Sequence, residues 1–251
     1  MYLTWLDSNS WLIEMGGKRI LLDPWLVGTL SFGIDWLFSA KRTRDRPIPP
    51  DIDLILLSQG LPDHAHPPTL EQLDRSIPVI ASPSAAKVAN SIGYSQVIPL
   101  EHGQSWMLGS LRLQAFPGSP IGPFTTENAY LLSDEQNTLY YEPHGYHDRT
   151  LPNSIDVVIT PLIDLNLPLI GSIIQGNRSA FDLIEQVQPQ AILPTAAGGE
   201  IEFAGLITPI LKAIGSVETL QSKLIDCGIS TQIIEPNPGD RLKISLKSRS
   251  V

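Results

Sequence analysis

Two short stretches of the sequence carry the side chains that could do chemistry. Residues 57–68, LSQGLPDHAHPP, place Asp63 and His64 directly after an apolar run, where a loop begins. Residues 142–148, EPHGYHD, offer two histidines and two carboxylates within one short loop. Carboxylate and imidazole groups bind divalent cations such as zinc, and a catalytic zinc site needs about three protein ligands. The sequence therefore predicts candidate metal ligands in two loops that are far apart in the chain.

Each group of donors has a second interpretation. Asp63 and His64 hold either a metal ion or one another, as a hydrogen-bonded pair that fixes the loop, and the hydrogen-bonded pair is the expected role. His144 and His147 are three residues apart and form either a local metal site or a polar loop at the rim of a pocket. His66 precedes two prolines and is expected to be an exposed loop histidine.

The length and composition bound what the chain can be. It has 251 residues, 42% hydrophobic and 17% charged, so it can bury a substantial core as one large α/β domain or two small ones. Its net charge of −9 argues against binding the phosphate backbone of nucleic acids. Cys227, its one cysteine, excludes an intrachain disulfide and fits a reducing compartment. Because neither a signal peptide nor an apolar stretch of about 20 residues is visible, we expect a cytoplasmic protein without a membrane span.

Short apolar runs separated by turn residues predict a chain rich in strands, with helices between some of them. Residues 52–57 form a nearly continuous apolar run, the pattern of a strand buried on both faces. Ser82 and Pro83 suit the cap and the first position of a helix that continues through residue 90. Further strands are predicted at residues 3–6, 11–14, 19–22, 79–80, 97–100, 105–108, 110–116, 129–133, 138–142, 155–160, 191–193, 231–234 and 241–246, and further helices at 69–74, 178–187, 201–214 and 217–227.

Residues 28–50 interrupt this pattern with aromatic residues, a basic cluster and three prolines. We interpret them as a long loop with a short helix at residues 34–40, which is either a lid over a pocket or a surface excursion. A lid would place Trp25 and Trp36 against an apolar pocket. Trypsin would then be expected to cut first at residues 42–46.

Five segments resemble, in the right order, consecutive parts of the metallo-β-lactamase superfamily: NSWLIEMGGKRILLDPWL, IDLILLSQGLPDHAH, LRLQAFPGSPIGP, TLYYEPHG and QAILPTAAGG. The resemblance covers most of the chain and implies a four-layer αββα sandwich, formed by residues 1–251 as a single domain. It also implies metal-assisted attack of water on a substrate bond. The predicted elements suit this fold, because strands followed by strand–helix units occur twice, as two face-to-face sheets with outer helices require.

The resemblance assigns residues 57–68 to the His-x-His-x-Asp-His metal motif of the family. Gln59 and Leu61 then stand at the two leading histidine positions, while Asp63 and His64 keep the last two. Leucine has no donor atom, and an amide is a poor ligand for zinc. The first of the two metal sites that the family builds is therefore expected to be absent.

The other ligand positions of the family are changed as well. The third histidine of the first site falls at Ser119 or the next residue, and the final histidine of the second site falls at Thr195 or the next residue. The bridging aspartate of the family falls between Glu142 and His144, and Asp23 follows the third strand beneath the site. The resemblance therefore implies one mononuclear set, made of Asp63 and His64 with Glu142 or His144, in a pocket lined by Asp23, Gln59, Ser119 and Thr195.

The resemblance thus implies a hydrolase-like protein with an altered, partly lost metal centre. It would bind zinc or another divalent metal, with at most one ion held tightly, and Asp63 and His64 would be its catalytic residues. Its partner would be a small molecule with an ester, amide, lactone or phosphodiester bond, rather than nucleic acid or a membrane. The alternative is a non-catalytic protein that keeps the fold to bind a small molecule or to serve as a structural part of an assembly.

Overall fold

Seven strands form the first of two large sheets in the computed structural model, which describes residues 1–121, 125–168, 171–196 and 198–247. They are β1 (Tyr2–Trp5), β2 (Trp11–Met15), β3 (Lys18–Leu22), β6 (Leu54–Leu57), β7 (Val79–Ala81), β8 (Val97–Pro99) and β20 (Arg241–Lys243). Their order across the sheet is β20-β1-β2-β3-β6-β7-β8. β1, β2 and β3 form an antiparallel meander, and β3, β6, β7 and β8 run parallel to one another.

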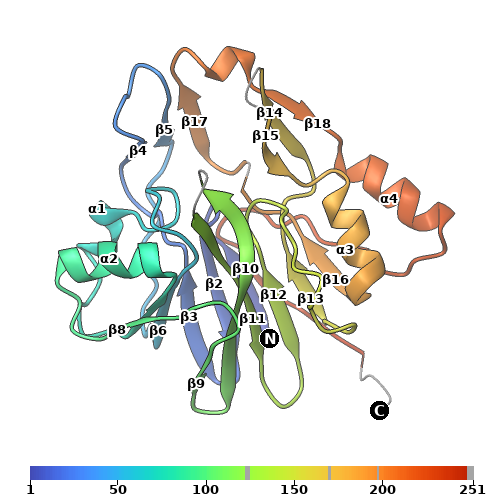
Figure 1. The fold of residues 1–251 in the computed structure, drawn as a ribbon, viewed down its shortest axis with the longest axis horizontal. Helices are drawn as coiled ribbons and strands as arrows, with labels where there is room; N and C mark the ends of the chain where they lie inside the picture. Colours follow the sequence, from blue (N-terminus) through green and yellow to red (C-terminus); the bar gives the residue numbers. More distant parts are fainter. Residues whose placement is uncertain (122–124, 169–170, 197, 248–251) are drawn as a thin grey trace.

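The second large sheet also has seven strands. They are β9 (Ser105–Leu108), β10 (Leu111–Ile121), β11 (Thr125–Ser133), β12 (Thr138–Tyr141), β13 (Val157–Ile159), β16 (Ala191–Leu193) and β19 (Gln232–Ile233). Their order is β19-β16-β13-β12-β11-β10-β9, with parallel pairing from β12 to β19 and antiparallel pairing from β9 to β12. Figure 1 shows the second large sheet, with β10 and β11, in front of the blue strands of the first.

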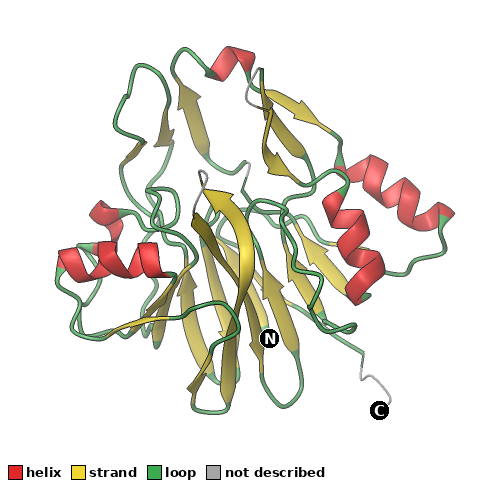
Figure 2. Cartoon of the chain, in the orientation of Figure 1, coloured by secondary structure: helices red, strands yellow, loops and turns green. Residues whose placement is uncertain are grey.

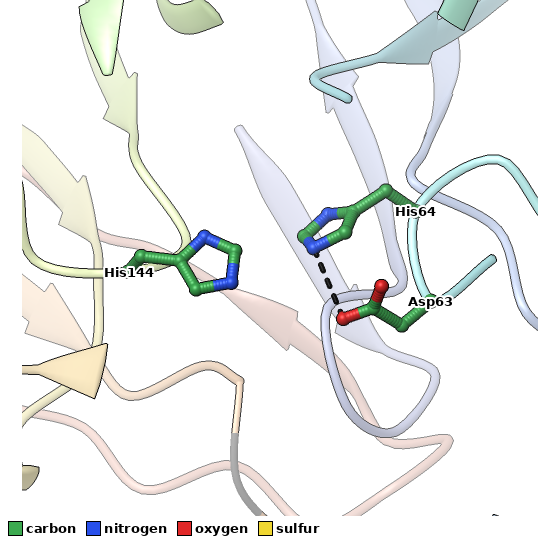
Figure 3. Close-up of side chains that lie close together, drawn as sticks. All are labelled: Asp63, His64 and His144. Atoms are coloured by element: carbon green, nitrogen blue, oxygen red, sulfur yellow. Dashed lines mark ion pairs between the residues drawn. The ribbon is translucent and has the colours of Figure 1, made fainter. Parts of the chain in front are cut away.

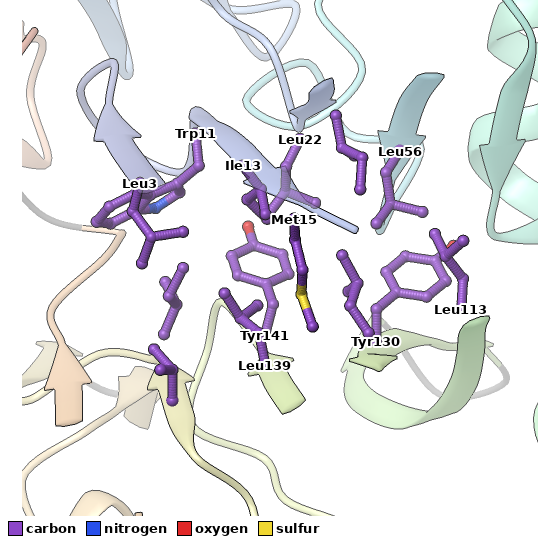
Figure 4. Packing of buried hydrophobic residues seen from close by; sticks show 14 of the residues in the cluster. Leu3, Trp11, Ile13, Met15, Leu22, Leu56, Leu113, Tyr130, Leu139 and Tyr141 are labelled. Carbon is purple, nitrogen blue, oxygen red and sulfur yellow. The ribbon is translucent and has the colours of Figure 1, made fainter. Parts of the chain in front are cut away.

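The two large sheets pack together because each turns a row of apolar side chains toward the other (Figure 4). Leu3 and Ile13 from the first sheet meet Tyr130, Leu139 and Tyr141 from the second. All five are fully buried, so this layer removes a large apolar area from water and stabilises the pairing of the sheets.

Helices α1 (Pro67–Leu70) and α2 (Pro83–Ile92) cover the outer face of the first sheet. Ala89 of α2 packs in one cluster with Ile55 and Leu57 of β6, whose alternate residues instead face the layer between the sheets. The strand at residues 52–57 is thus buried on both faces, as its continuous apolar run predicted. The cap of α2 is also as predicted, because Oγ of its preceding serine accepts a hydrogen bond from the helix backbone.

Helices α3 (Ser179–Val187) and α4 (Val217–Asp226) cover the outer face of the second sheet. Phe181 of α3 and Leu224 of α4 pack against Ile192 of β16 in one buried cluster. The order helix, sheet, sheet, helix confirms the predicted four-layer αββα sandwich (Figure 2). Among the helices of the described residues, none has the length and apolar character that a membrane crossing requires.

Two three-stranded sheets extend one end of the sandwich (Figure 1). One contains β4 (Thr29–Ser31), β5 (Ser39–Arg42) and β17 (Ile201–Ala204), and the other contains β14 (Asp164–Leu167), β15 (Gly171–Gln175) and β18 (Lys212–Ile214).

The helices predicted at residues 34–40 and 201–214 are therefore wrong. Within 201–214 the structure has two strands around one 3-10 turn, η1 (Thr208–Ile210). β17 pairs with β5, so part of each predicted helix is instead a strand. Its partner strand lies more than 150 residues away, where the local sequence pattern could not reveal it. Gly205 follows β17 with a φ of +113°, a backbone conformation that no helix contains.

Residues 28–50 are more ordered than the predicted loop, because they contain both β4 and β5. Arg42 is only 3% exposed and forms a buried ion pair with Asp7, whereas Arg44 in the same segment is exposed, so the first cut at residues 42–46 stays a prediction that now falls on Arg44. Trp25 is fully buried beneath the small sheet, whereas Trp36 is 67% exposed. The two tryptophans therefore do not line a common pocket.

The loops that carry candidate ligands start at one end of the sandwich. Asp23 follows β3 and Ser58 follows its parallel neighbour β6, so both lie at the same edge of the first sheet. Glu142 follows β12 at the corresponding edge of the second sheet. The hydroxyl of Tyr141 donates a 2.7 Å hydrogen bond to Oδ2 of Asp23, which joins the two edges. Side chains from distant parts of the chain can therefore meet here.

Candidate metal centre

The structure brings Asp63, His64 and His144 together at this end of the sandwich. One donor atom from each side chain lies within 4.8 Å of the other two. Nε2 of His64 is 3.2 Å from Oδ2 of Asp63, and the rings of His64 and His144 are 5.2 Å apart between centroids. Figure 3 shows the His144 ring and the Asp63 carboxylate both directed toward the space beside His64.

Asp23 sets the orientation of the His64 ring. It is fully buried at the end of β3, with a φ of +42°, and its Oδ1 accepts a 2.7 Å hydrogen bond from the backbone N–H of Ser58. Its Oδ2 accepts a 2.7 Å hydrogen bond from Nδ1 of His64. Nε2 of His64 is therefore the ring atom that faces Asp63. Metal-binding histidines typically donate their other ring N–H to a carboxylate in this way.

Gln59 and Ser119 hold the other histidine. Nδ1 of His144 lies 2.9 Å from the side-chain amide of Gln59 and 3.2 Å from the hydroxyl of Ser119. A half-turn of that amide lets the otherwise unpaired Oε1 of Gln59 accept the N–H of Nδ1, which leaves Nε2 of His144 with a free lone pair. The opposite ring atom of His144, Nε2, is then the one turned toward Asp63 (Figure 3). The two predicted pocket residues thus position a candidate ligand.

The charges around the centre set the protonation of its histidines. Burial, together with the nearby charge of His64, lowers the pKa of His144 to about 3, so this ring is neutral and can bind a metal. Burial also opposes the charged form of His64, but the carboxylates of Asp63 and Asp23 outweigh it and raise its pKa to about 10. The positive charge of His64 in turn outweighs burial at Asp63 and lowers its pKa. A cation at Nε2 of His64 must therefore displace a proton.

Glu142 lies outside the cluster of donor atoms, although the sequence proposed it as a ligand. It is fully buried, and its Oε2 accepts hydrogen bonds from the backbone N–H groups of His144, at 3.0 Å, and Tyr146, at 2.8 Å, as well as from Gly145. Burial raises its pKa to about 7 despite these contacts. Glu142 therefore shapes the turn that presents His144.

Thr195 and His66 are both buried and hydrogen-bonded. The hydroxyl of Thr195 accepts from Nε1 of Trp11 and donates to the carbonyl of Ser8, both at 3.1 Å, so it braces the loop that carries Asn9. His66 is buried, and the prediction that it is exposed is wrong. Its ring lies 3.0 Å from the hydroxyl of Thr69, so it fixes the start of α1.

His147 does not join His144 in a local metal site. Its ring is buried against Tyr140, with ring centroids 5.8 Å apart, while His144 faces the cluster with Asp63 and His64. Burial lowers the pKa of His147 to about 3. The three-residue spacing therefore separates the two histidines onto different sides of the loop.

Asn9 is a further residue at the centre that was not predicted from the sequence. Its side chain is 2% exposed, and its Nδ2 lies 3.2 Å from Nε2 of His64. It precedes β2 in a loop whose residues Asp7 and Ser8 have positive φ values of 76° and 49°. An asparagine in a short turn is common, so the sequence offers no signal that this one reaches a histidine 55 residues away.

Several buried oxygen atoms around the cluster lack a hydrogen-bond partner within the described part of the chain. Buried polar atoms in proteins are nearly always paired, so such a group indicates an ion or a solvent molecule. Two imidazoles and a carboxylate form the donor set of many mononuclear zinc and iron centres. The residues therefore fit one divalent cation. The unpaired atoms are Oδ1 of Asn9, Oε1 of Gln59, Oδ1 of Asp63 and Oε1 of Glu142.

One protein family matches most of this chain. The family described as "Beta-lactamase superfamily domain" matches residues 2–196. A UPF0173 metal-dependent hydrolase of Chelativorans sp. is 23% identical over 263 residues, which cover 97% of this chain and 100% of that protein. A UPF0173 protein of Pyrococcus furiosus is 26% identical over 205 residues, which cover 79% of this chain and 84% of that protein.

Solved structures show the same fold at low sequence identity. An isothiocyanate hydrolase from Delia radicum gut bacteria superposes with a TM-score of 0.69 and 14% identity, over 98% of this chain and 100% of that one. A metallo hydrolase of Ignicoccus hospitalis superposes with a TM-score of 0.68 and 15% identity, over 98% of this chain and 99% of that one. These similarities show the fold alone. The chemistry of this protein has to be inferred from its own residues.

Proposed function

Because the chain belongs to the metallo-β-lactamase superfamily, we propose that it is a metal-dependent hydrolase that uses a single divalent cation. Asp63, His64 and His144 would hold the cation, with residues 1–251 acting as one domain. The observation that carries the proposal is the convergence of their donor atoms within 4.8 Å from two loops of different sheets. The description of the Chelativorans relative as a metal-dependent hydrolase supports it.

A second cation has no comparable set of donors among the residues at the family's ligand positions. Leu61 has no donor atom, and Gln59 uses its amide on His144. Ser119 lies beside the same ring nitrogen, and Thr195 bonds Trp11 instead. The altered motif is therefore proposed to give a mononuclear centre.

Each residue of the centre has a distinct part in the proposed reaction. A divalent cation at this place would polarise a substrate oxygen and make water a stronger nucleophile. Asp23 fixes the ring of His64, and Gln59 fixes that of His144. Asp63 would bind the cation through Oδ2, which faces Nε2 of His64, while its buried Oδ1 has no hydrogen-bond partner within the described residues. That oxygen is placed to accept the proton that water loses on attack.

The substrate is proposed to be a small molecule with an ester, amide, lactone or phosphodiester bond. Bonds of this kind are cleaved by metal-assisted attack of water, and loops at the strand ends would select among them. A panel of chromogenic substrates, one for each bond type, tests the assignment with protein loaded with zinc, iron or manganese. Turnover that disappears with chelator supports the proposal.

Metal content gives the sharpest test. Protein purified without chelator and measured by elemental analysis should carry about one divalent ion per chain, held by a donor set of ordinary size. His144→Ala should lose most of this metal, whereas His102→Ala should keep it, because His102 is exposed and lies outside the donor cluster. Two tightly held ions per chain, no metal at all, or equal metal in the two variants would overturn the proposal.

A non-catalytic role is the second candidate, and one observation favours it. Protonated His64 pairs with both Asp63 and Asp23, so each of the two carboxylates has a partner without a metal ion. The protein would then keep its pocket to bind a small molecule. Absence of metal uptake, together with thermal stabilisation by a small molecule whose bonds stay intact, would support this role.

A further inference from the structure

The position of Asn9 suggests more than a contact with His64. Its terminal amide and Oδ2 of Asp63 are each 3.2 Å from the same atom, Nε2 of His64. Donor atoms that share one cation at bond lengths of about 2.1 Å are separated by roughly 3.0–3.5 Å. The amide of Asn9 therefore lies where a neighbouring ligand of the same ion would lie.

The side-chain amide of Asn9 also has an oxygen atom that is available to bind a cation. Its Oδ1 is buried without a hydrogen-bond partner within the described residues, which is costly for an amide oxygen. A half-turn of the terminal amide exchanges Oδ1 with Nδ2, so the oxygen can take the place 3.2 Å from Nε2 of His64. An amide oxygen is a ligand for divalent cations such as manganese and calcium.

The loop that carries Asn9 is fixed from both sides. The carbonyl of Ser8 accepts hydrogen bonds from Nε1 of Trp5, at 2.9 Å, and from the hydroxyl of Thr195, at 3.1 Å. Asp7 is fully buried and paired with Arg42. Since Asp7 and Ser8 have positive φ, a conformation that is unfavourable for side chains other than glycine, the fold maintains a strained turn that presents Asn9.

We propose that Oδ1 of Asn9 is a fourth protein donor to the divalent cation. The inference rests on the metal centre proposed above and adds a residue to it. Two nitrogen donors, from His64 and His144, and two oxygen donors, from Asp63 and Asn9, would surround the ion. Four protein donors and an open position for substrate require more than four ligands in total. The centre should therefore accept five- or six-coordinate ions such as manganese and iron(II) as well as zinc.

Cobalt(II) is the probe, because its visible absorption bands grow more intense as the number of ligands falls. Wild type, Asn9→Leu and Asn9→Asp are titrated with cobalt(II) against a competing chelator, and folding is checked by circular dichroism. Asn128→Leu is the matched control. Asn128 is also a buried asparagine with an unpaired Oδ1, but its Nδ2 bonds the carbonyl of Leu100 instead of His64.

Asn9→Leu should bind cobalt roughly 10–100-fold more weakly than wild type, the range found when groups around a metal are removed. Its absorption bands should become more intense, because one ligand is lost. Asn9→Asp keeps an oxygen at the same place and should restore both affinity and spectrum. Asn128→Leu should match wild type in both.

The outcomes separate this inference from the function on which it rests. Wild type that takes up no cobalt would overturn both. Wild type that binds cobalt while Asn9→Leu keeps the same affinity and spectrum would overturn only the role of Asn9. The ligand role of Asn9 would also be overturned if Asn9→Leu and Asn9→Asp lose the same amount of cobalt affinity while their spectra stay unchanged. The amide N–H of Asn9 would then act only on His64.

Discussion

Nδ1 of His64 donates a 2.7 Å hydrogen bond to Oδ2 of Asp23, from the loop after β6 to the end of the adjacent strand β3. Both side chains are fully buried. This contact determines which nitrogen of His64 faces Asp63, and so whether the pair can share a cation. The parallel pairing of β3 with β6 is what brings the two residues together.

Asp23→Asn should weaken metal binding by roughly 10–100-fold, because the amide cannot match the charge of the carboxylate on Nδ1 of His64. Asparagine tolerates the φ of +42° at this position, so the backbone should be kept. Tyr141→Phe is the control, since it removes another donor to the same oxygen but leaves the carboxylate. Competition titrations with a chelator measure the affinities, and equal effects of the two changes would contradict an orienting role for Asp23.

Removal of the metal should leave the protein folded. Without a cation His64 takes up a proton, since its pKa is raised to about 10, and stays paired with Asp63 and Asp23. The melting temperature should therefore fall only by the lost binding free energy, about 2–4 °C for each kcal/mol. His64→Ala leaves two buried carboxylates without this partner and should cost roughly 1–3 kcal/mol with or without metal.

Thermal melts of both proteins with and without EDTA test this expectation. Wild type should show a small drop that re-added zinc reverses. His64→Ala should melt lower than wild type and be insensitive to EDTA. Global unfolding of the wild type by EDTA would mean that the loop needs its cation to fold.

His147 should make the protein less stable in mild acid. Burial lowers its pKa from 6.5 to about 3, so between these values the unfolded chain binds a proton that the folded chain does not. Its contribution to stability is present above pH 6.5 and is lost as the pH falls toward 3. The slope is up to about 1.4 kcal/mol per pH unit. His147→Leu should flatten the dependence of the unfolding free energy on pH between 6.5 and 4.

Urea titrations at several pH values measure this slope. His102→Leu serves as the control, because His102 is exposed. The flattening should be seen with His147→Leu and not with His102→Leu. Parallel curves for wild type and His147→Leu would show that His147 titrates as it does in the unfolded chain.

Arg42→Met should destabilise the fold strongly. Arg42 and Asp7 are both buried, and breaking such a pair from one side typically costs about 3–5 kcal/mol, here reduced by Arg46, which stays bonded to Asp7 at 2.8 Å. Arg178→Met is the matched control. Its pair with Asp182 spans 3.5 Å between side chains that are 88% and 57% exposed, so its loss should cost no more than about 1 kcal/mol. Urea denaturation compares the two, and similar midpoints would contradict a structural role for the buried pair.

The sandwich and its motif were predictable because they depend on local order along the chain. The apolar run before the loop at residues 57–68 predicted a strand buried on both faces, and the cap of α2 followed from Ser82 and Pro83. Burial and capping act within a few residues of the positions that cause them. The resemblance of five ordered segments then led from these elements to the αββα fold.

The small sheets were not predictable for the opposite reason. β5 and β17 lie more than 150 residues apart, and each becomes a strand only because the other is present. The local sequence pattern favoured a helix at each place, but pairing between the two segments made both of them strands. The ion pair between Arg42 and Asp7, which joins residues 35 positions apart, was hidden in the same way.

By itself, the sequence determined the fold and placed Asp63 and His64 in the segment that resembles the metal motif of the family. It could not choose between Glu142 and His144, because two residues in one tight turn point in different directions. The tertiary structure decided that Glu142 binds backbone N–H groups while His144 meets Asp63. It also brought Asn9 to His64, since the loops before β2 and after β6 meet only once these strands have joined one sheet.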